Sequence, residues 1–281
     1  MRHADHGGPG EGPRVVYLHG LGGSRLDWTD LATIMRPHVR GLAVDLPGFG
    51  ATPTGGRSTS VTSNADATAR WLHAVVREPV VLVGTSMGAL IAASVAARAP
   101  ELILGIALVS TPMPGSALGS HGDVRRAALA GAIPGIGEYL LRRRQATVSA
   151  RERVTQMLRR SCHDPARISP ATLAALIRTE EQASVRPASQ YLRAARSIAM
   201  TVACWRAYWA RLSTITVPVL LVHAIHDQLV PIAAARAAAR RFPLWSYAEL
   251  DCGHVAHLES PGDLAGILLA WIAAAVSPTL R

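Results

Sequence analysis

The segment Gly84–Gly88, with the sequence Gly-Thr-Ser-Met-Gly, constrains the fold of this chain more than any other. The apolar run Pro79–Val83 comes directly before it, and the alanine-rich stretch Ala89–Arg98 comes directly after it. The first pattern predicts a buried strand and the second a helix, so Ser86 stands where one becomes the other. Glycines two residues before and after a serine let neighbouring chain pass close to a sharp, strained turn. We therefore predict a nucleophile elbow, with an ordinary tight turn as the alternative.

A glycine-rich loop follows an earlier apolar run. Arg14–Leu18 predicts a buried strand, and it leads directly into His19-Gly20-Leu21-Gly22-Gly23. A helical pattern follows near residues 27–35. Loops of this kind direct backbone N–H groups at an oxyanion that develops during acyl transfer.

Aspartate and histidine follow two later strands in the same way. Asp227 lies just past the run Val217–Val222, and His254 lies just past the short run Ser246–Leu250. A serine hydroxyl is a poor nucleophile until a base takes its proton, and the base needs a third group to fix its tautomer. The chain order of serine, aspartate and histidine therefore predicts a set of three cooperating groups.

Taken together, these segments resemble the α/β-hydrolase superfamily, in its lid-bearing branch of serine esterases, lipases and C–C hydrolases. The matching motifs follow the order of that family along nearly the whole chain. They are HG-x-G-G at His19–Gly23, D-L-P-G-F-G at Asp45–Gly50, G-x-S-M-G at Gly84–Gly88, D-x-L-V-P at Asp227–Pro231 and G-H-x-x-H-L-E-x-P at Gly253–Pro261.

The resemblance implies a role for each matched residue. Ser86 is the implied nucleophile, His254 the general base, and Asp227 the carboxylate that orients and stabilises the imidazolium. The backbone N–H groups of Leu21 and Met87 are the implied oxyanion hole. An aspartate at position 86 would imply dehalogenase or epoxide-hydrolase chemistry, so the serine favours acyl transfer to water or a related C–C cleavage.

Other titratable residues near these loops are interpreted as structural. His257 lies three positions beyond His254, and we expect it to pack the loop rather than act as the base. His223 and His226 flank the acid, and we expect both to be hydrogen-bonded fillers. Asp251 precedes His254 on the same strand end, which places it badly to reach the far ring nitrogen. No group of cysteines, histidines and carboxylates shows ligand spacing, so we expect no metal and no cofactor.

The apolar pattern as a whole predicts an α/β fold. Alternating strands and helices are typical of a mostly parallel twisted sheet with helices on both faces. Only 18 residues precede His19, whereas the resemblance implies two antiparallel strands there. We expect N-terminal strands that are shortened or missing, with at best a stub around Arg2–His6, unless the true start of the chain lies upstream. The predicted strands are 14–18, 41–46, 80–84, 103–110, 217–222 and 246–250, and the predicted core helices are 61–76, 89–98, 231–241 and 263–275.

A long insertion separates the strand that ends near Ser110 from the one that starts at Val217. It is helical in pattern, with a capping-box sequence at Ser149–Glu152 before residues 154–160, a helix from 170 to 181, and a long amphipathic stretch from 188 to 212. We expect an α/β-hydrolase core at 1–111 and 214–281 and a helical lid at 112–213. Its hinge residues are Pro112, Pro114, Gly115, Gly119 and Gly122.

Three aromatic residues recur at helical spacing in the lid: Trp205, Tyr208 and Trp209. They could line a substrate-binding acyl pocket, and a plain core stripe that packs the lid onto the sheet is the equal alternative.

The net charge of the chain is concentrated in the lid. From Gly115 to Ser213 there are 16 arginines and 6 acidic residues, a net charge of +10, while the rest sums to zero. Such a surface could dock an acidic carrier protein, attract an anionic substrate such as an acyl-CoA, or lie on an anionic membrane. A solvated arginine-rich face is the alternative that we favour. We expect no nucleic-acid partner, because no binding motif accompanies the charge.

Composition favours a cytoplasmic protein. The three cysteines are widely separated, which argues against a disulfide framework. Residues 1–13 are polar with no apolar core, so we expect no secretory signal. Residues 79–97 carry no charge, but their glycines and strand-to-helix break favour a buried strand and helix over a membrane span.

These patterns together predict a cofactor-independent serine hydrolase for a carboxylic ester of a small or medium apolar acyl group. The same triad could instead cleave a thioester or a C–C bond, or transfer or cyclise the acyl group. A ligand-sensing protein that retains a hydrolase shell is the remaining alternative, because Ala224 stands where the family more often has glycine before the acid loop.

Overall fold

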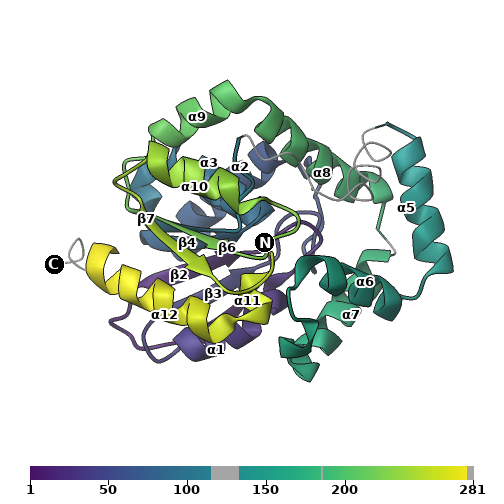
Figure 1. Ribbon diagram of the computed structural model, residues 1–281, viewed down its shortest axis with the longest axis horizontal. Helices are drawn as coiled ribbons and strands as arrows, with labels where there is room; N and C mark the ends of the chain where they lie inside the picture. Colours follow the sequence, from purple (N-terminus) through teal and green to yellow (C-terminus); the bar gives the residue numbers. More distant parts are fainter. Residues whose placement is uncertain (115–132, 185, 277–281) are drawn as a thin grey trace.

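The computed structural model describes residues 1–114, 133–184 and 186–276. Its centre is a seven-stranded sheet in the order β1-β3-β2-β4-β5-β6-β7 (Figure 1). All neighbouring pairs are parallel except β1 with β3. The predicted α/β architecture is therefore confirmed. The strands are β1 (His3–Gly7), β2 (Arg14–Leu18), β3 (Arg40–Val44), β4 (Val80–Thr85), β5 (Ile103–Val109), β6 (Val219–Ala224) and β7 (Ser246–Leu250).

The N-terminal edge of the sheet is short, as expected. The predicted stub is β1, which runs antiparallel to β3 and pairs His3 with Val44 and Gly7 with Gly41. Its register shifts between Asp5 and Gly7. A single five-residue antiparallel strand therefore forms this edge.

Helices cover both faces of the sheet (Figure 1). Alternate side chains of a strand point to opposite faces, so Val80 and Leu82 of β4 join one apolar cluster while Val81 and Val83 join the other. The first cluster includes side chains of α2 (Val61–Trp71), α3 (Met87–Ala96) and α10 (Ile232–Arg241). The second includes side chains of α1 (Thr29–Met35) and α12 (Pro261–Trp271).

Helix α3 is buried along its whole length. Small alanine side chains let a helix without a polar face pack closely under its neighbours. The uncharged stretch 79–97 is thus β4 followed by α3, and among the described residues no helix is both long and apolar enough to cross a membrane.

Among the residues that the structure describes, five α-helices lie between β5 and β6. They are α5 (Ile136–Thr147), α6 (Ala150–Ser161), α7 (Pro170–Ser184), α8 (Ala188–Ala203) and α9 (Trp205–Ser213). The prediction of one continuous helix over 188–212 was wrong. The helix is interrupted at Cys204, whose ψ of 48° is not helical. The hinge glycines Gly115, Gly119 and Gly122 lie outside the described residues.

Several short helical turns complete the part of the chain that the structure describes. They are η1 (Arg25–Trp28), η2 (Leu72–Val76), η3 (Pro100–Leu102), η4 (Pro165–Arg167), α11 (Ala256–Glu259) and η5 (Ile272–Val276).

The insertion contacts the core in two different ways. Helices α8 and α9 supply Ala194, Ile198, Tyr208 and Leu212 to the large cluster above α2 and α3. Helices α6 and α7 instead form a small cluster of their own with Leu258 of α11, and with α5 they extend to one side of the molecule (Figure 1). The division into core and lid at residues 112 and 213 stays a prediction, and α8 and α9 share their apolar core with the sheet.

Polar contacts fasten the insertion around the carboxyl edge of the sheet. Asp30 accepts hydrogen bonds from Ser169 (2.9 Å) and Thr172 (2.6 Å) at the start of α7. On another side, the Thr59 hydroxyl donates to the Gln190 carbonyl at 2.5 Å. These contacts hold α7 and α8 over the loops that follow the parallel strands.

Candidate active site

Ser86 lies between β4 and α3 in a backbone conformation that side chains rarely adopt. Its φ is 51° and its ψ is −113°. A Cβ on Gly84 would lie 2.4 Å from the Gly88 carbonyl carbon, and one on Gly88 would lie 2.1 Å from the Leu18 oxygen. Only glycine fits at these two positions, which is why the elbow pattern has glycine on both sides. Met87 is the first residue of α3, so its N–H has no acceptor within the helix.

We expect Ser86→Gly to stabilise the protein. The dihedral angles of Ser86 are a mirror image of an ordinary extended conformation, so glycine adopts them without strain. Relief of that strain should raise the free energy of unfolding by about 1 kcal/mol, after the greater backbone entropy of glycine is counted. Urea denaturation of Ser86→Gly against Ser86→Ala measures the difference, since alanine keeps the strain. Equal midpoints for the two variants would contradict a strained elbow.

The glycine-rich loop after β2 lies against the elbow. A Cβ on Gly20 would lie 3.5 Å from the Cβ of Ser86. His19 braces this loop, because its Nδ1–H donates to the Gly20 carbonyl (2.7 Å) and its Nε2 accepts from the Leu46 N–H (3.1 Å). Burial lowers the pKa of His19 to about 4 despite the bond to Gly20, so the ring is neutral and keeps both bonds at neutral pH. Leu21 packs partly buried against the core in the same loop.

Asp227 and His254 meet at the carboxyl edge of the sheet. The Nδ1–H of His254 donates to Oδ2 of Asp227 at 2.7 Å. The other carboxylate oxygen accepts from the N–H groups of Leu229 and Val230, each at 2.8 Å. Burial alone would raise the pKa of Asp227, but its interaction with His254 and the hydrogen bond from the Val230 N–H lower it below its usual value. The carboxylate is therefore ionised and fixes the His254 tautomer that leaves Nε2 without a proton.

The three candidate residues follow strands that end at the same edge of the sheet. Ser86 follows β4, Asp227 follows β6 and His254 follows β7, and these strands are parallel. The carboxyl ends of parallel strands lie together at one edge, where such sheets bind their ligands. The contact of Ser86 with His254 stays a prediction.

The other histidines near these loops do not make the short hydrogen bond to Asp227 that His254 makes, although Nε2 of His223 lies 3.5 Å from Oδ2 of Asp227. His257 is buried with its ring 4.6 Å from that of Trp28, and burial lowers its pKa to about 3. The Nε2–H of His223 donates to the Val230 carbonyl (2.9 Å). His226 is exposed and bonds Asp251 at 2.9 Å. Of the two histidines considered as the base, His254 therefore donates a hydrogen bond to Asp227, whereas His257 packs in the core.

A buried carboxylate joins the His254 loop to the insertion. Glu259 accepts hydrogen bonds from the backbone N–H groups of Gly253 (2.8 Å), His163 (3.0 Å) and Asp164 (2.8 Å). A Cβ on Gly253 would lie 2.4 Å from the Ser161 carbonyl oxygen, so the two segments touch at this point. Sequence reasoning missed this role, although Glu259 belongs to the quoted G-H-x-x-H-L-E-x-P pattern.

The aromatic residues of α9 lie in three different environments. Tyr208 is buried in the main core cluster, and its hydroxyl donates to the Pro112 carbonyl (3.1 Å). Trp209 packs beside Phe242 with ring centroids 5.9 Å apart, and Trp205 is half exposed. Tyr208 and Trp209 therefore lie where a stripe of core residues that packs the insertion onto the sheet would lie.

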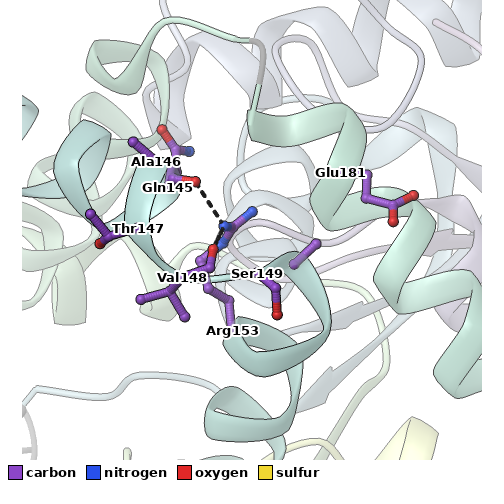
Figure 2. Close-up of a pocket in the computed structure, with 8 residues that line it drawn as sticks. Gln145, Ala146, Thr147, Val148, Ser149, Arg153 and Glu181 are labelled. Carbon is purple, nitrogen blue, oxygen red and sulfur yellow. Dashed lines mark hydrogen bonds between the residues drawn. The ribbon is translucent and has the colours of Figure 1, made fainter.

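An open pocket of about 330 Å³ lies between the α5–α6 turn and α7 (Figure 2). The Arg153 side chain organises it by donating to the Gln145 carbonyl (3.2 Å), to the Val148 carbonyl and to the Glu180 carboxylate (2.5 Å). None of the candidate catalytic residues lines this pocket. It is a feature of the insertion, separate from the candidate catalytic residues.

The chain belongs to the α/β-hydrolase fold family, whose model matches residues 13–261. A pimeloyl-[acyl-carrier protein] methyl ester esterase of Aromatoleum aromaticum is 29% identical over 91% of this chain and 96% of its own length. The 2-hydroxy-6-oxo-6-(2'-aminophenyl)hexa-2,4-dienoic acid hydrolase of Metapseudomonas resinovorans is 24% identical over 94% of this chain and 85% of its own length.

Solved structures agree on the fold. A haloalkane dehalogenase loop variant from Bradyrhizobium elkanii superposes with a TM-score of 0.81 at 22% identity, covering 99% of this chain and 95% of its own. The family model and the two relatives found by sequence support a hydrolase.

Proposed function

We propose that this protein is a serine hydrolase that cleaves a carboxylic ester of a small or medium apolar acyl group through an acyl-enzyme intermediate. The observation that carries the proposal is the 2.7 Å bond between His254 and Asp227, on loops at the same sheet edge as the strained Ser86. Esterase and deacetylase relatives that match over most of the chain support it further.

In the proposed reaction, the Ser86 oxygen attacks the ester carbonyl carbon while His254 Nε2 takes the hydroxyl proton. Asp227 stabilises the resulting imidazolium. The N–H groups of Met87 and Leu21 hold the oxyanion, and His254 returns its proton to the departing alcohol. Water then attacks the acyl-enzyme by the same proton route and frees Ser86.

A carrier-bound ester is the second candidate substrate. Five arginines are exposed on α5 and α6: Arg142, Arg143, Arg151, Arg159 and Arg160. Such a surface suits an acidic partner, and the Aromatoleum relative is named for a carrier-protein-bound ester. Thioester and C–C bond cleavage by the same triad, acyl transfer and ligand sensing remain the further alternatives.

A fluorophosphonate probe tests the serine mechanism. Because the probe phosphonylates only an activated serine, the folded protein should gain one adduct, which peptide mapping should place on Ser86. Protein unfolded in urea should gain none. Turnover of p-nitrophenyl esters of rising chain length, beside acyl-CoA and carrier-protein methyl esters, then ranks the substrate classes. An adduct on another serine, or equal labelling of the unfolded chain, would refute the proposal.

A further inference from the structure

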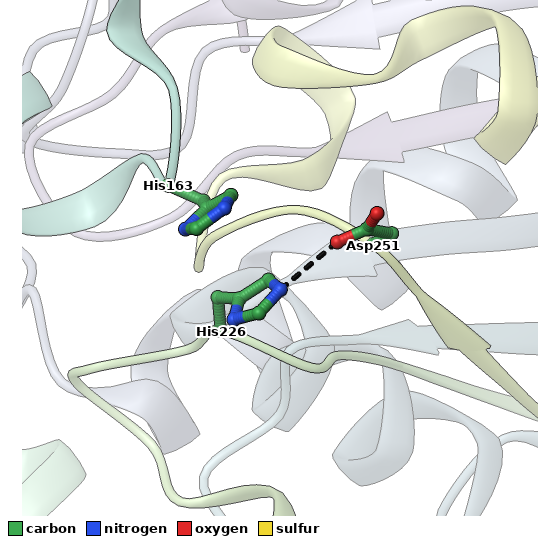
Figure 3. A group of neighbouring side chains, drawn as sticks. All are labelled: His163, His226 and Asp251. Atoms are coloured by element: carbon green, nitrogen blue, oxygen red, sulfur yellow. Dashed lines mark hydrogen bonds and ion pairs between the residues drawn. The ribbon is translucent and has the colours of Figure 1, made fainter.

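Three exposed side chains from separate segments gather at one place (Figure 3). His163 follows α6 in the insertion, His226 immediately precedes Asp227, and Asp251 follows β7. One ring nitrogen of each histidine and a carboxylate oxygen of Asp251 all lie within 4.8 Å of one another. The imidazole rings stack with centroids 3.8 Å apart.

Backbone hydrogen bonds fix all three segments. The N–H of His163 is held by Glu259, and the N–H of His226 donates to the Cys252 carbonyl at 3.1 Å. Arg167 donates to the Asp251 backbone carbonyl (3.1 Å). The main chain is therefore braced at each residue, while the side chains remain open to solvent.

We propose that His163, His226 and Asp251 form a binding site for a divalent transition metal such as Zn²⁺. Two imidazoles and one carboxylate suit zinc, nickel or copper better than magnesium or calcium, which prefer oxygen ligands. Zinc binds such atoms at about 2.0–2.2 Å, so two ligand atoms of one ion lie roughly 3.4 Å apart. His226 and Asp251, at 2.9 Å, must therefore separate slightly, while the more distant pairs, which lie within 4.8 Å, must come closer. Rotation of the exposed His163 side chain, which ends the ring stacking, brings its nitrogen to the ion.

Metal binding replaces an existing hydrogen bond. The Nε2–H of His226 donates to Oδ1 of Asp251, and the metal takes the place of this hydrogen between the two side chains, while the neutral ring carries its proton on Nδ1. The ion then ties the insertion to the loops that carry Asp227 and His254. A metal that binds only the folded arrangement stabilises it.

Zinc titration of the chelator-treated protein tests the site. We expect calorimetry to show one equivalent of Zn²⁺ bound and the melting temperature to rise, with no response to Mg²⁺. His163→Ala and Asp251→Asn should each weaken Zn²⁺ binding by at least roughly tenfold. His38→Ala, which removes an exposed histidine outside the cluster, should bind Zn²⁺ as the wild type does.

The metal-free melting temperature of each variant shows whether it is folded, and His163→Gln replaces the alanine variant if that one is unstable. Absence of zinc binding by the wild type, or equal affinity in His163→Ala and His38→Ala, would overturn the proposal. Neither result depends on esterase activity, so the metal site and the proposed function are tested separately.

Discussion

Ser86→Ala should lower kcat/KM for p-nitrophenyl acyl esters by roughly 10⁴-fold or more. The hydroxyl that would form the acyl-enzyme is then missing, and water must attack the ester without a covalent intermediate. Alanine keeps the Cβ and the positive φ of Ser86, so the elbow and the melting temperature should be unchanged. Steady-state kinetics with thermal unfolding on the same preparation measures both.

Ser63→Ala is the matched control for this loss. Ser63 lies in the first turn of α2 and is not one of the candidate catalytic residues, and alanine is a good helix former there. It should leave kcat/KM within about twofold of the wild type, since no group at the candidate site changes. Comparable turnover by Ser86→Ala and wild type would mean that another group performs the chemistry, and the serine mechanism would fall.

The strands and the elbow could be predicted because each leaves a local signal. Parallel strands covered on both faces are continuous apolar runs, and the predicted bounds 14–18 and 246–250 coincide with β2 and β7. The glycines of the elbow are required by contacts with the backbone only a few residues away or on the neighbouring strand.

The break between α8 and α9 had no such signal. The amphipathic period continues through Cys204 without a glycine or proline. The helices part because their tertiary contacts differ: Ser197 of α8 accepts from the Val61 N–H (3.0 Å), whereas Tyr208 of α9 reaches Pro112. Contacts between residues so distant in sequence cannot be inferred from periodicity.

Some contacts of the candidate site could likewise be predicted from the sequence, and others could not. Asp227 and His254 follow strands in recognisable motifs, so their pairing could be expected. Glu259 bonds His163 across 96 positions of the chain, and the cluster of His163, His226 and Asp251 also spans the insertion and two loops. Nothing in the sequence indicated the Glu259 contact or the cluster, because only the fold brings these distant segments together.

Glu259→Gln should destabilise the protein by about 3 kcal/mol, because a buried N–H left without an acceptor costs roughly 1–3 kcal/mol. One oxygen of Glu259 accepts from Asp164 and His163, and the other accepts from Gly253 and His163. Glutamine replaces one of these oxygens with an NH₂ group. Whichever way the amide is turned, that group faces an N–H donor, so at least one backbone donor loses its acceptor. Urea denaturation measures the loss.

The same substitution should lower kcat/KM for esters by roughly 10²-fold, because Gly253 precedes His254 directly and a displacement of about 1 Å can cost that much. Glu249→Gln is the matched control: Glu249 lies on β7 and pairs with the exposed Arg236, so its loss should cost less than about 1 kcal/mol. If Glu259 only packs the loop, the variant should lose stability but keep its kcat/KM at a low temperature at which it is folded. Loss of activity under those conditions identifies Glu259 as a positioning residue for His254. Equal stability of the two variants would show that the three backbone bonds contribute little.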